Sequence, residues 1–443
     1  MHLSQLTDIL QGQLIGEDRE FKNVSIDSRT VQNGDCFFAI KGEFFDGHDF
    51  IDAVAKKNAA VIIVDRHVNS AIPSIVVQNT RHALIQLARF YRENTPIPVA
   101  AITGSCGKTT TRALLENILK QSGNVLASQK SFNNDIGLPL TLLQLKPTHD
   151  FIVLEIGTNH PGEIAHLAKI AKPTIAAITM VAPVHIEHFG NSEAIAREKG
   201  SLFENLTPDG IAVINADDAF ANLWKKLSQN HRIITFGREK KSDVMAHDIQ
   251  ITQNGQTTFT LILPNKSESI SLPLLGEHNV INALCAAAMA FALNISPEAI
   301  KKGLETAQSE YGRLIEKKGF TGAIIIDDSY NANPTSVKAA IMLLTHRSKN
   351  AILVLGDMAE LGDISDKMHT EVGEFAKNAG IKQLFCYGKH SAQTAKAFGK
   401  QAEHFEDQQQ LANALKKYLT QDTTVLVKGS RSMKMEKIVE ALL

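Results

Sequence analysis

The chain has 443 residues, of which 44% are hydrophobic and 21% are charged. This length exceeds one ordinary hydrophobic core and predicts about three domains, and the composition is typical of a globular protein. The 46 basic and 47 acidic residues leave a formal net charge of -1, which excludes a global field that would steer the chain to nucleic acid or to an anionic membrane.

The sequence pattern favours a protein of the cytosol. No uncharged apolar run approaches the roughly 20 residues that span a bilayer. Residues 1–13 lack a basic stretch followed by an apolar core. The four cysteines are scattered without metal-type spacing, which fits reduced thiols. We therefore expect a cytoplasmic protein with no membrane insertion and no nucleic-acid partner.

Residues 1–82 predict a small α/β domain. A polar, glycine-bearing segment over 41–59 leads into a helix. A helical stretch over 81–93 and the turn at Pro96–Pro98 then mark a boundary. The strand-like runs of this domain lie within 24–29, 34–40, 59–65 and 74–78.

Residues 97–118 (IPVAAITGSCGKTTTRALLENI) predict a strand, a glycine-bearing loop and a helix that begins at the loop. The N–H groups of such a loop and the positive helix end bind phosphate oxygens, while Lys108 can reach the terminal phosphates and the Thr109 hydroxyl can hold Mg2+. The full P-loop pattern has a glycine where this chain has Ile102, so the loop is a shortened P-loop opened by Gly104. It predicts a nucleoside triphosphate ligand but not the reaction.

The rest of the segment 83–311 predicts a doubly wound, mainly parallel sheet, because apolar runs that end in polar residues or glycine alternate with helical patterns. Such sheets bind ligands at the carboxyl ends of their strands. Alternation over 245–275 predicts an appended β-hairpin, and two helices follow, the second with Ser296 as its N-cap. The strand-like runs are 99–103, 151–157, 174–180, 210–216 and 232–237.

A third α/β unit is predicted over 312–443, where strand-like runs again alternate with helical patterns. Arg313 and the late run KGSRSMKME supply cations that could meet phosphates or a carboxylate. The strand-like runs of this unit are 322–330, 351–357, 382–388 and 423–430.

Three residues that follow the P-loop are candidates for metal chemistry. Glu155 ends an apolar strand, where a carboxylate is well placed to ligate Mg2+, and an acid at a helix N-terminus is the structural alternative. His185 follows another strand, and a metal ligand and a hydrogen-bonded loop histidine fit this position equally well. Lys199 lies in a helical stretch, and its pattern alone predicts a solvated lysine.

Amides and carboxylates at strand and helix ends are candidates for ligand recognition. Asn133 and Asn134 precede a turn, so turn formation competes with ligand binding as their role. Asn282 lies on an otherwise apolar helix, and the edge of an adenine could supply the partners that a buried amide needs. Asp327 and Asp328 end a strand directly before SYNANPTS, and this concentration of polar groups favours recognition of a polar substrate.

Taken in order, these motifs resemble the Mur ligase family, ATP-dependent amino-acid ligases of bacterial cell-wall precursor synthesis. The TGSCGKTT loop is similar to that family's shortened version, and EIGTNHPGEI, the His185 segment, AREKGSLF, GEHNVINALCAA and GRLIE follow in the same order. The resemblance covers essentially the whole chain. It implies a UDP-binding domain over 1–82, an ATP-binding domain over 83–311, and a Rossmann-like domain over 312–443 that contributes to ATP and dipeptide binding.

Two segments, DSRTVQNGDCFFAIKGEFFDGHDF and DDSYNANPTSVKAAI, resemble the family member that acts on UDP-N-acetylmuramoyl-tripeptide and D-alanyl-D-alanine. The resemblance implies that ATP, with Mg2+, phosphorylates the terminal carboxylate of the tripeptide. The amine of the dipeptide then attacks the acyl phosphate, which gives the pentapeptide, ADP and phosphate.

The resemblance also implies a set of site residues. Catalysis would rest on Lys108, Glu155, His185 and Lys199. The Mg2+ ligands would be Thr109, Glu155, His185 and Lys199, the last as the carbamate that some members carry. ATP would contact Gly104, Ser105, Cys106, Gly107, Lys108, Thr109, Thr110, Asn282, Arg313 and Asp328. The UDP end would contact Ser28, Arg29, Lys41, Gly42, Asp46 and His48. The rest of the sugar nucleotide would pass Asn133 and Asn134. The dipeptide would face Tyr330, Asn331 and Asn333.

Two alternatives remain open. One is another ligase of the same superfamily, either another Mur enzyme or folylpolyglutamate synthase. The KGEFFDGH segment argues against the folate enzyme, which lacks a comparable UDP domain. A P-loop switch or transport ATPase would give no reason for DDSYNANPTS. We also expect a monomer, and the sequence does not identify the third residue of the tripeptide.

Overall fold

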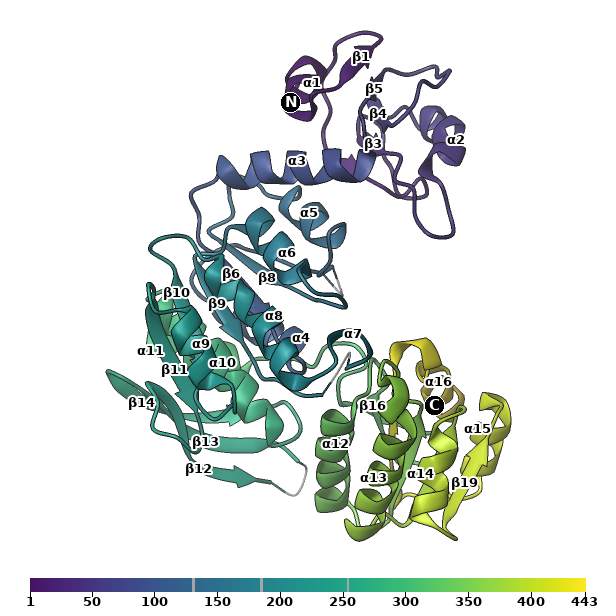
Figure 1. The fold of residues 1–443 in the computed structure, drawn as a ribbon. Coiled ribbons are helices and arrows are strands. Elements are labelled where there is room, and N and C mark those ends of the chain that lie inside the picture. The colour runs from purple at the N-terminus through teal and green to yellow at the C-terminus, as the bar shows by residue number, and fades with distance from the viewer. Residues whose placement is uncertain (130–131, 184–185, 253–254) are drawn as a thin grey trace.

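The computed structural model describes residues 1–129, 132–183, 186–252 and 255–443. Over these residues the chain forms three lobes built around sheets of five, nine and six strands (Figure 1). The expected fold class, three α/β domains with a mainly parallel central sheet, is confirmed. Within the same residues, no helix has the length and apolar character needed to cross a bilayer.

The N-terminal lobe has the strand order β1-β5-β4-β3-β2, with β1 antiparallel to β5 and the other pairs parallel. Phe38 and Ile63 from the sheet pack with Leu6 of α1 and Leu84 of α3 in one core. Neither α1 nor β1 was among the predicted elements. The bounds are α1 Leu3–Leu10, β1 Gln13–Ile15, β2 Val24–Ser25, β3 Cys36–Phe38, α2 Ile51–Lys56, β4 Val61–Val64, β5 Ser74–Val76 and α3 Thr80–Glu93.

The central lobe has the strand order β14-β13-β12-β11-β10-β9-β6-β8-β7. Its strands pair in parallel from β7 to β12, and β12, β13 and β14 are antiparallel. The single hairpin predicted over 245–275 is therefore wrong in extent, because a tight turn between Leu263 and Lys266 adds a third strand. The strand bounds are β6 Val99–Thr103, β7 Val125–Ala127, β8 Phe151–Glu155, β9 Ile175–Ile178, β10 Ile211–Asn215, β11 Arg232–Gly237, β12 Val244–Ile251, β13 Thr257–Leu263 and β14 Lys266–Leu272.

Helices cover both faces of the central sheet. The alanine-rich helix α10 is buried along most of its length and packs with α4 in the largest core cluster. The Ser296 side chain accepts a hydrogen bond from the Ala299 N–H, as expected for the N-cap of α11. The bounds are α4 Lys108–Leu119, α5 Gly137–Leu142, α6 Glu163–Ala171, α7 Ile186–Phe189, α8 Ser192–Glu204, α9 Ala221–Leu227, α10 His278–Ala292 and α11 Pro297–Glu305.

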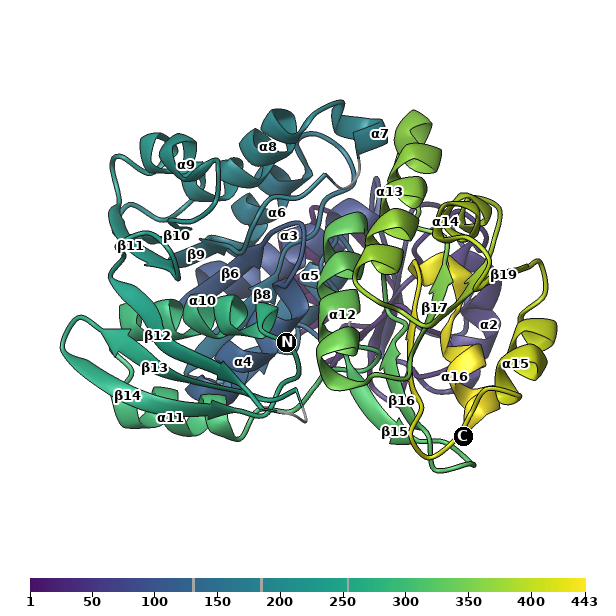
Figure 2. The same ribbon diagram turned by 90° about the horizontal axis from the view of Figure 1, so that it is seen from below.

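The C-terminal lobe has the strand order β15-β16-β20-β17-β18-β19, in which only β15 is antiparallel to its neighbour among the described strands. Helix α12 lies on the side that faces the central lobe (Figures 1 and 2). The bounds are β15 Ile315–Lys318, β16 Ile324–Asp328, α12 Pro334–Arg347, β17 Ala351–Gly356, α13 Ser365–Asn378, β18 Gln383–Tyr387, α14 Ser391–Phe398, β19 Ala402–Phe405, α15 Gln408–Lys416, β20 Thr424–Lys428 and α16 Glu436–Leu442.

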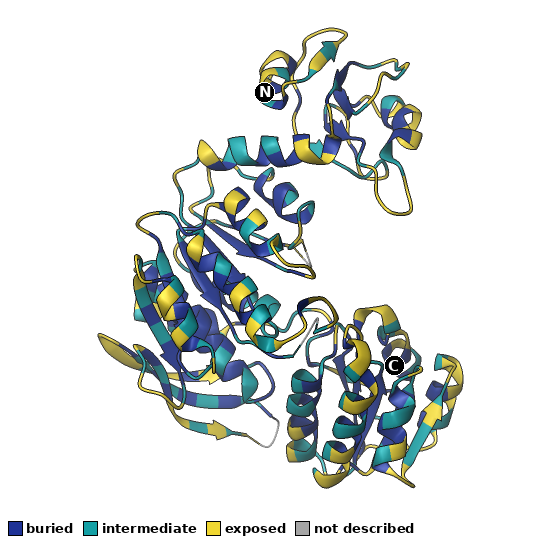
Figure 3. Cartoon of the chain, viewed as in Figure 1, coloured by how far each residue is buried: buried dark blue, intermediate teal, exposed yellow. Residues whose placement is uncertain are grey.

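Burial explains which strands the sequence revealed. In the two larger sheets, inner strands such as β6 and β17 are buried throughout, and Figure 3 shows dark ribbons in the interior of both sheets. The unpredicted strands β7, β15 and β19 lie at or beside sheet edges and are partly exposed, so their apolar signal is weak.

Candidate active site

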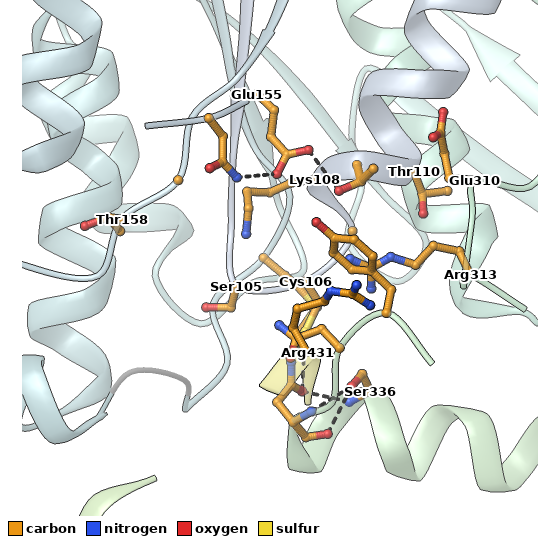
Figure 4. A pocket seen from close by; sticks show the side chains of 18 of the residues that line it. Ser105, Cys106, Lys108, Thr110, Glu155, Thr158, Glu310, Arg313, Ser336 and Arg431 are labelled. Carbon is orange, nitrogen blue, oxygen red and sulfur yellow. Dashed lines mark hydrogen bonds between the residues drawn. The ribbon is translucent and has the colours of Figure 1, made fainter. Parts of the chain in front are cut away.

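A cavity of about 1220 Å³ lies where the lobes meet. The N-terminal lobe contributes Glu43 and the start of α3 contributes Arg81. The central lobe contributes the P-loop, and the C-terminal lobe contributes Tyr330 and Arg431 among others. Figure 4 shows Arg313, Arg431 and Ser336 in the same space as the loop residues Ser105 and Cys106. Residues that are far apart in the chain thus share one site.

The P-loop follows β6 and leads into α4, in the order predicted from sequence. The Lys108 ammonium donates a 2.7 Å hydrogen bond to the Gly104 carbonyl, which holds the side chain across its own loop. Gly107 has a φ of +84°, and a Cβ there would lie 2.2 Å from Asn282 Oδ1. A Cβ on Gly104 would lie 1.9 Å from Thr179 Oγ1. The positive φ angles of Gly104 (+150°) and Gly107 favour glycine, and a side chain at either position would also press on Thr179 or Asn282.

Glu155 brings three segments together at the end of β8. The residue is 3% exposed. One carboxylate oxygen accepts a 2.8 Å hydrogen bond from the Thr109 hydroxyl, and the other accepts a 2.8 Å hydrogen bond from the Asn133 amide. A hydroxyl and a carboxylate are hard oxygen donors, so this pair fits the preference of Mg2+. The Asn134 side chain instead accepts from the Gly137 N–H at 2.8 Å, although the residue still lines the cavity.

Lys199 is not the solvated lysine that its sequence pattern predicts. It lies on α8 and is 2% exposed. Burial, and to a lesser extent the charge of Lys108, lowers the pKa of Lys199 to about 7. The amine is therefore partly neutral at physiological pH, which is the form that reacts with CO2. His185 lies outside the described residues.

Asn282 and Asn279 form a buried amide pair on α10. Asn282 Nδ2 donates a 2.8 Å hydrogen bond to Asn279 Oδ1, and Asn279 Nδ2 donates to the Leu275 carbonyl at 2.7 Å. Both residues also line the cavity. The partners expected for the buried Asn282 amide thus come in part from the protein itself.

The DDSYNANP segment packs against the late basic run. Lys428, 1% exposed, donates to Asp328 Oδ2 at 2.6 Å and to the Asn331 carbonyl at 2.9 Å. The Arg313 guanidinium lies 4.4 Å from the centre of the Tyr330 ring, a cation–π contact. The Lys428–Asp328 pairing was not predicted, and the run KGSRSMKME was its only sequence signal.

Asn333 connects the C-terminal lobe to the P-loop. Its side-chain oxygen accepts from the Ser336 N–H at 2.9 Å and caps α12. Its amide nitrogen lies 3.1 Å from Cys106 Sγ. Tyr330, Asn331 and Asn333 all line the cavity.

The candidate residues for the UDP end do not line this cavity, although the neighbouring Glu43 does. Arg29 pairs with Asp27 at 2.7 Å, and the Ser28 carbonyl accepts from Lys57 at 2.9 Å. Burial would raise the pKa of Asp46, but hydrogen bonds from His48 and Arg66 outweigh it and hold the pKa below its usual value. Lys41, Gly42, Asp46 and His48 lie in and beside a tight turn of the N-terminal lobe.

The sequence matches known families along most of its length. Residues 20–92 match the Mur ligase family catalytic domain, residues 102–290 match the Mur ligase middle domain, and residues 312–431 match the Mur ligase glutamate ligase domain. The UDP-N-acetylmuramoyl-tripeptide–D-alanyl-D-alanine ligase of Escherichia coli K12 is 41% identical over 99% of this chain and 98% of its own. The ligase of the same description from Bacillus subtilis 168 is 33% identical over 100% of this chain and 98% of its own.

Solved structures agree with the sequence matches. A crystal structure of MurF from Acinetobacter baumannii superposes with a TM-score of 0.92 at 35% identity and covers 99% of this chain and 98% of its own. MurF ligase from Thermotoga maritima, solved in complex with ADP, gives a TM-score of 0.83 at 28% identity over 95% of this chain and 97% of its own. Folylpolyglutamate synthase from Mycobacterium tuberculosis, at 15% identity, shares the fold alone. From its domain matches, its identity to these relatives and its fold, the chain belongs to the Mur ligase family.

Proposed function

We propose that this chain joins D-alanyl-D-alanine to UDP-N-acetylmuramoyl-tripeptide with ATP, in the synthesis of peptidoglycan precursors. The observation that carries the assignment is 41% identity to an enzyme of that description over 99% of the chain. A cavity lined by all three lobes supports it, because the reaction must hold a nucleotide, a sugar-nucleotide peptide and a dipeptide together.

The reaction proceeds in two steps. An oxygen of the tripeptide carboxylate attacks the γ-phosphorus of ATP, and ADP leaves. The dipeptide amine then attacks the carbonyl carbon of the acyl phosphate, the bond from carbon to the phosphate oxygen breaks, and the nitrogen loses a proton. Lys108 would leave its Gly104 carbonyl to neutralise charge on the transferred phosphoryl group.

Mg2+ would be held by Thr109, Glu155, His185 and the carbamate of Lys199. The bound ion would neutralise charge on the phosphates. Thr109 and Glu155 already lie within hydrogen-bond distance of each other, which supports a shared ligand. The remaining nucleotide contacts would come from the loop residues Gly104 to Thr110 and from Asn282, Arg313 and Asp328.

We assign the substrates to the lobes by the residues that each lobe presents. Ser28, Arg29, Lys41, Gly42, Asp46 and His48 would bind the UDP end, Asn133 and Asn134 the path toward the P-loop, and Tyr330, Asn331 and Asn333 the dipeptide. Because the UDP residues do not line the cavity, their role requires the long substrate to extend from the N-terminal lobe. The domains would be 1–82, 83–311 and 312–443, in a cytoplasmic monomer.

Phosphate release with a substrate panel tests this function. We expect release to require ATP, UDP-N-acetylmuramoyl-tripeptide and D-alanyl-D-alanine together. Stimulation by a single amino acid and not by the dipeptide would assign another Mur reaction. ATP turnover without any UDP-sugar peptide would favour a switch or transport ATPase.

A further inference from the structure

The segment that leads into the C-terminal lobe is tied along the P-loop helix. Asn117 of α4 donates to the Gly303 carbonyl at 2.6 Å and to Thr306 Oγ1 at 3.0 Å. Five residues closer to the P-loop on the same helix, Arg112 donates to Glu310 Oε1 at 2.8 Å. The linker, residues 306–314, therefore runs antiparallel to α4 and returns toward the phosphate loop.

Arg112 is the buried cation of this contact. Its side chain is 5% exposed and bonds two carboxylates, Glu116 on its own helix at 2.5 Å and Glu310 on the linker at 2.8 Å. Glu116 also accepts from Lys120 at 2.6 Å. A guanidinium presents its donors in a rigid fork, and Arg112 uses one nitrogen for each carboxylate, Nη1 for Glu116 and Nη2 for Glu310.

The residues that follow Glu310 enter the cavity. The Arg313 N–H donates to the Glu310 carbonyl at 3.0 Å, and the Tyr330 N–H donates to the Gly312 carbonyl at 3.1 Å. Gly312 has a φ of +64°, and a Cβ there would lie 3.0 Å from the Tyr330 nitrogen. The Arg313 guanidinium then stacks on the Tyr330 ring. Figure 4 shows Glu310 and Arg313 on the same side of the cavity.

We propose that Arg112 and Glu310 are positioning residues, whose ion pair sets the register of the linker on α4 and so places Arg313 and Tyr330 opposite the phosphate loop. Since α4 begins at Lys108, the pair joins the helix that carries the P-loop to the entry of the C-terminal lobe. The inference rests on the proposed function, in which Arg313 contacts the nucleotide and Tyr330 the dipeptide.

The two carboxylates on Arg112 supply a matched pair of variants. Glu310→Gln removes the negative charge on the linker, and Glu116→Gln removes the equivalent charge within one helix. We expect Glu310→Gln to lower kcat roughly ten- to a hundredfold, because small misplacement of positioned groups has effects of that size. Glu116→Gln should keep kcat within about twofold, and the KM for UDP-N-acetylmuramoyl-tripeptide should be unchanged in both.

Thermal unfolding of both variants separates positioning from stability. Similar Tm values with a kcat loss in Glu310→Gln alone support the proposal, whereas equal kcat values for the two variants overturn it. If Glu310→Gln does not fold, the double variant Arg112→Met with Glu310→Met removes both partners and leaves Glu116 paired with Lys120. Wild-type kcat in that double variant would also overturn the proposal. Failure of the proposed function would appear separately, as no dipeptide-stimulated phosphate release by the unaltered protein.

Discussion

Thr109, in the first turn of the P-loop helix, donates a 2.8 Å hydrogen bond to Glu155, which lies 46 positions further along the chain. The contact forms because β6 and β8 are neighbouring parallel strands, so the loop after one and the carboxylate that ends the other meet at the same edge of the sheet. Asn133 bonds the second oxygen of the same carboxylate. This edge therefore presents hard oxygen donors beside the P-loop.

The negative charge of Glu155 should determine the Mg2+ concentration that the reaction requires. Glu155→Gln keeps an acceptor for Thr109 but removes the negative charge, so we expect the Mg2+ concentration for half-maximal phosphate release to rise roughly tenfold or more. A Mg2+ titration of phosphate release measures this change. Glu193→Gln, on the exposed face of α8, is the control and should leave the titration unchanged. An unaltered Mg2+ requirement in Glu155→Gln would remove Glu155 from the metal site.

Lys108 should be needed for phosphoryl transfer but not for binding of the sugar nucleotide. Lys108→Ala is expected to abolish ADP formation, while calorimetry should show nearly unchanged binding of UDP-N-acetylmuramoyl-tripeptide, since the proposed UDP residues belong to another lobe. Lys120→Ala, at the end of the same helix, is the matched control. Near-normal ADP formation by Lys108→Ala would contradict the proposed role.

Lys199 should form a carbamate in a pH-dependent way. At an ordinary lysine pKa of about 10.4, only about one amine in a few thousand is neutral at pH 7. With the pKa of Lys199 lowered to about 7, the neutral fraction of its amine rises as the pH increases through 7 and falls as the pH decreases. In 13C-bicarbonate, NMR should therefore show a carbamate signal at pH 8 that is lost toward pH 6. Lys199→Arg should show none, and no signal at pH 8 in the unaltered protein would refute the modification.

Gly107 should resist replacement more than a glycine with the same backbone conformation in open space. Gly162 has a φ of +90° with nothing within 4 Å of an added Cβ, so Gly162→Ala should cost only the left-handed backbone, about 1–2 kcal/mol. Gly107→Ala also meets Asn282, which should add about 1–3 kcal/mol and weaken ATP binding. Urea denaturation and nucleotide titration measure the two effects. Equal losses in both variants would show that the Asn282 contact is unimportant.

The buried pair of Lys428 and Asp328 should be costly to break. Lys428→Met leaves the Asp328 carboxylate buried without its cation, and we expect a loss of about 3–5 kcal/mol in the free energy of unfolding. Arg197→Met breaks the exposed pair with Glu193 and should cost at most about 1 kcal/mol. Urea denaturation compares them, and a small loss in Lys428→Met would mean that solvent reaches Asp328.

Local features of the site were predictable because they depend on residues close together in the chain. The strand, loop and helix around Lys108 follow from an apolar run, two glycines and a helical pattern, and the structure has them in that order. The N-cap Ser296 is equally local. Strands β7, β15 and β19 were missed, since partly exposed strands at or beside sheet edges carry little apolar signal.

Burial of polar groups was less predictable. The helical pattern around Lys199 describes one helix and not the elements that pack over it. The sequence therefore predicts a solvated lysine, although the fold buries this residue. Lys428 and Asp328 are 100 positions apart, and the sequence around either residue does not indicate that the two side chains pair.

A shortened P-loop and a motif order that indicates the Mur ligase family can both be read from the sequence, because both depend on contiguous residues. The distant groups that lie beside that loop and its helix became known from the three-dimensional fold. Thr109 contacts Glu155 because their strands are neighbours in the sheet. Arg112 contacts Glu310, 198 positions away, because the linker runs back along α4. Such partners are selected by packing in three dimensions, which spacing along the chain does not record.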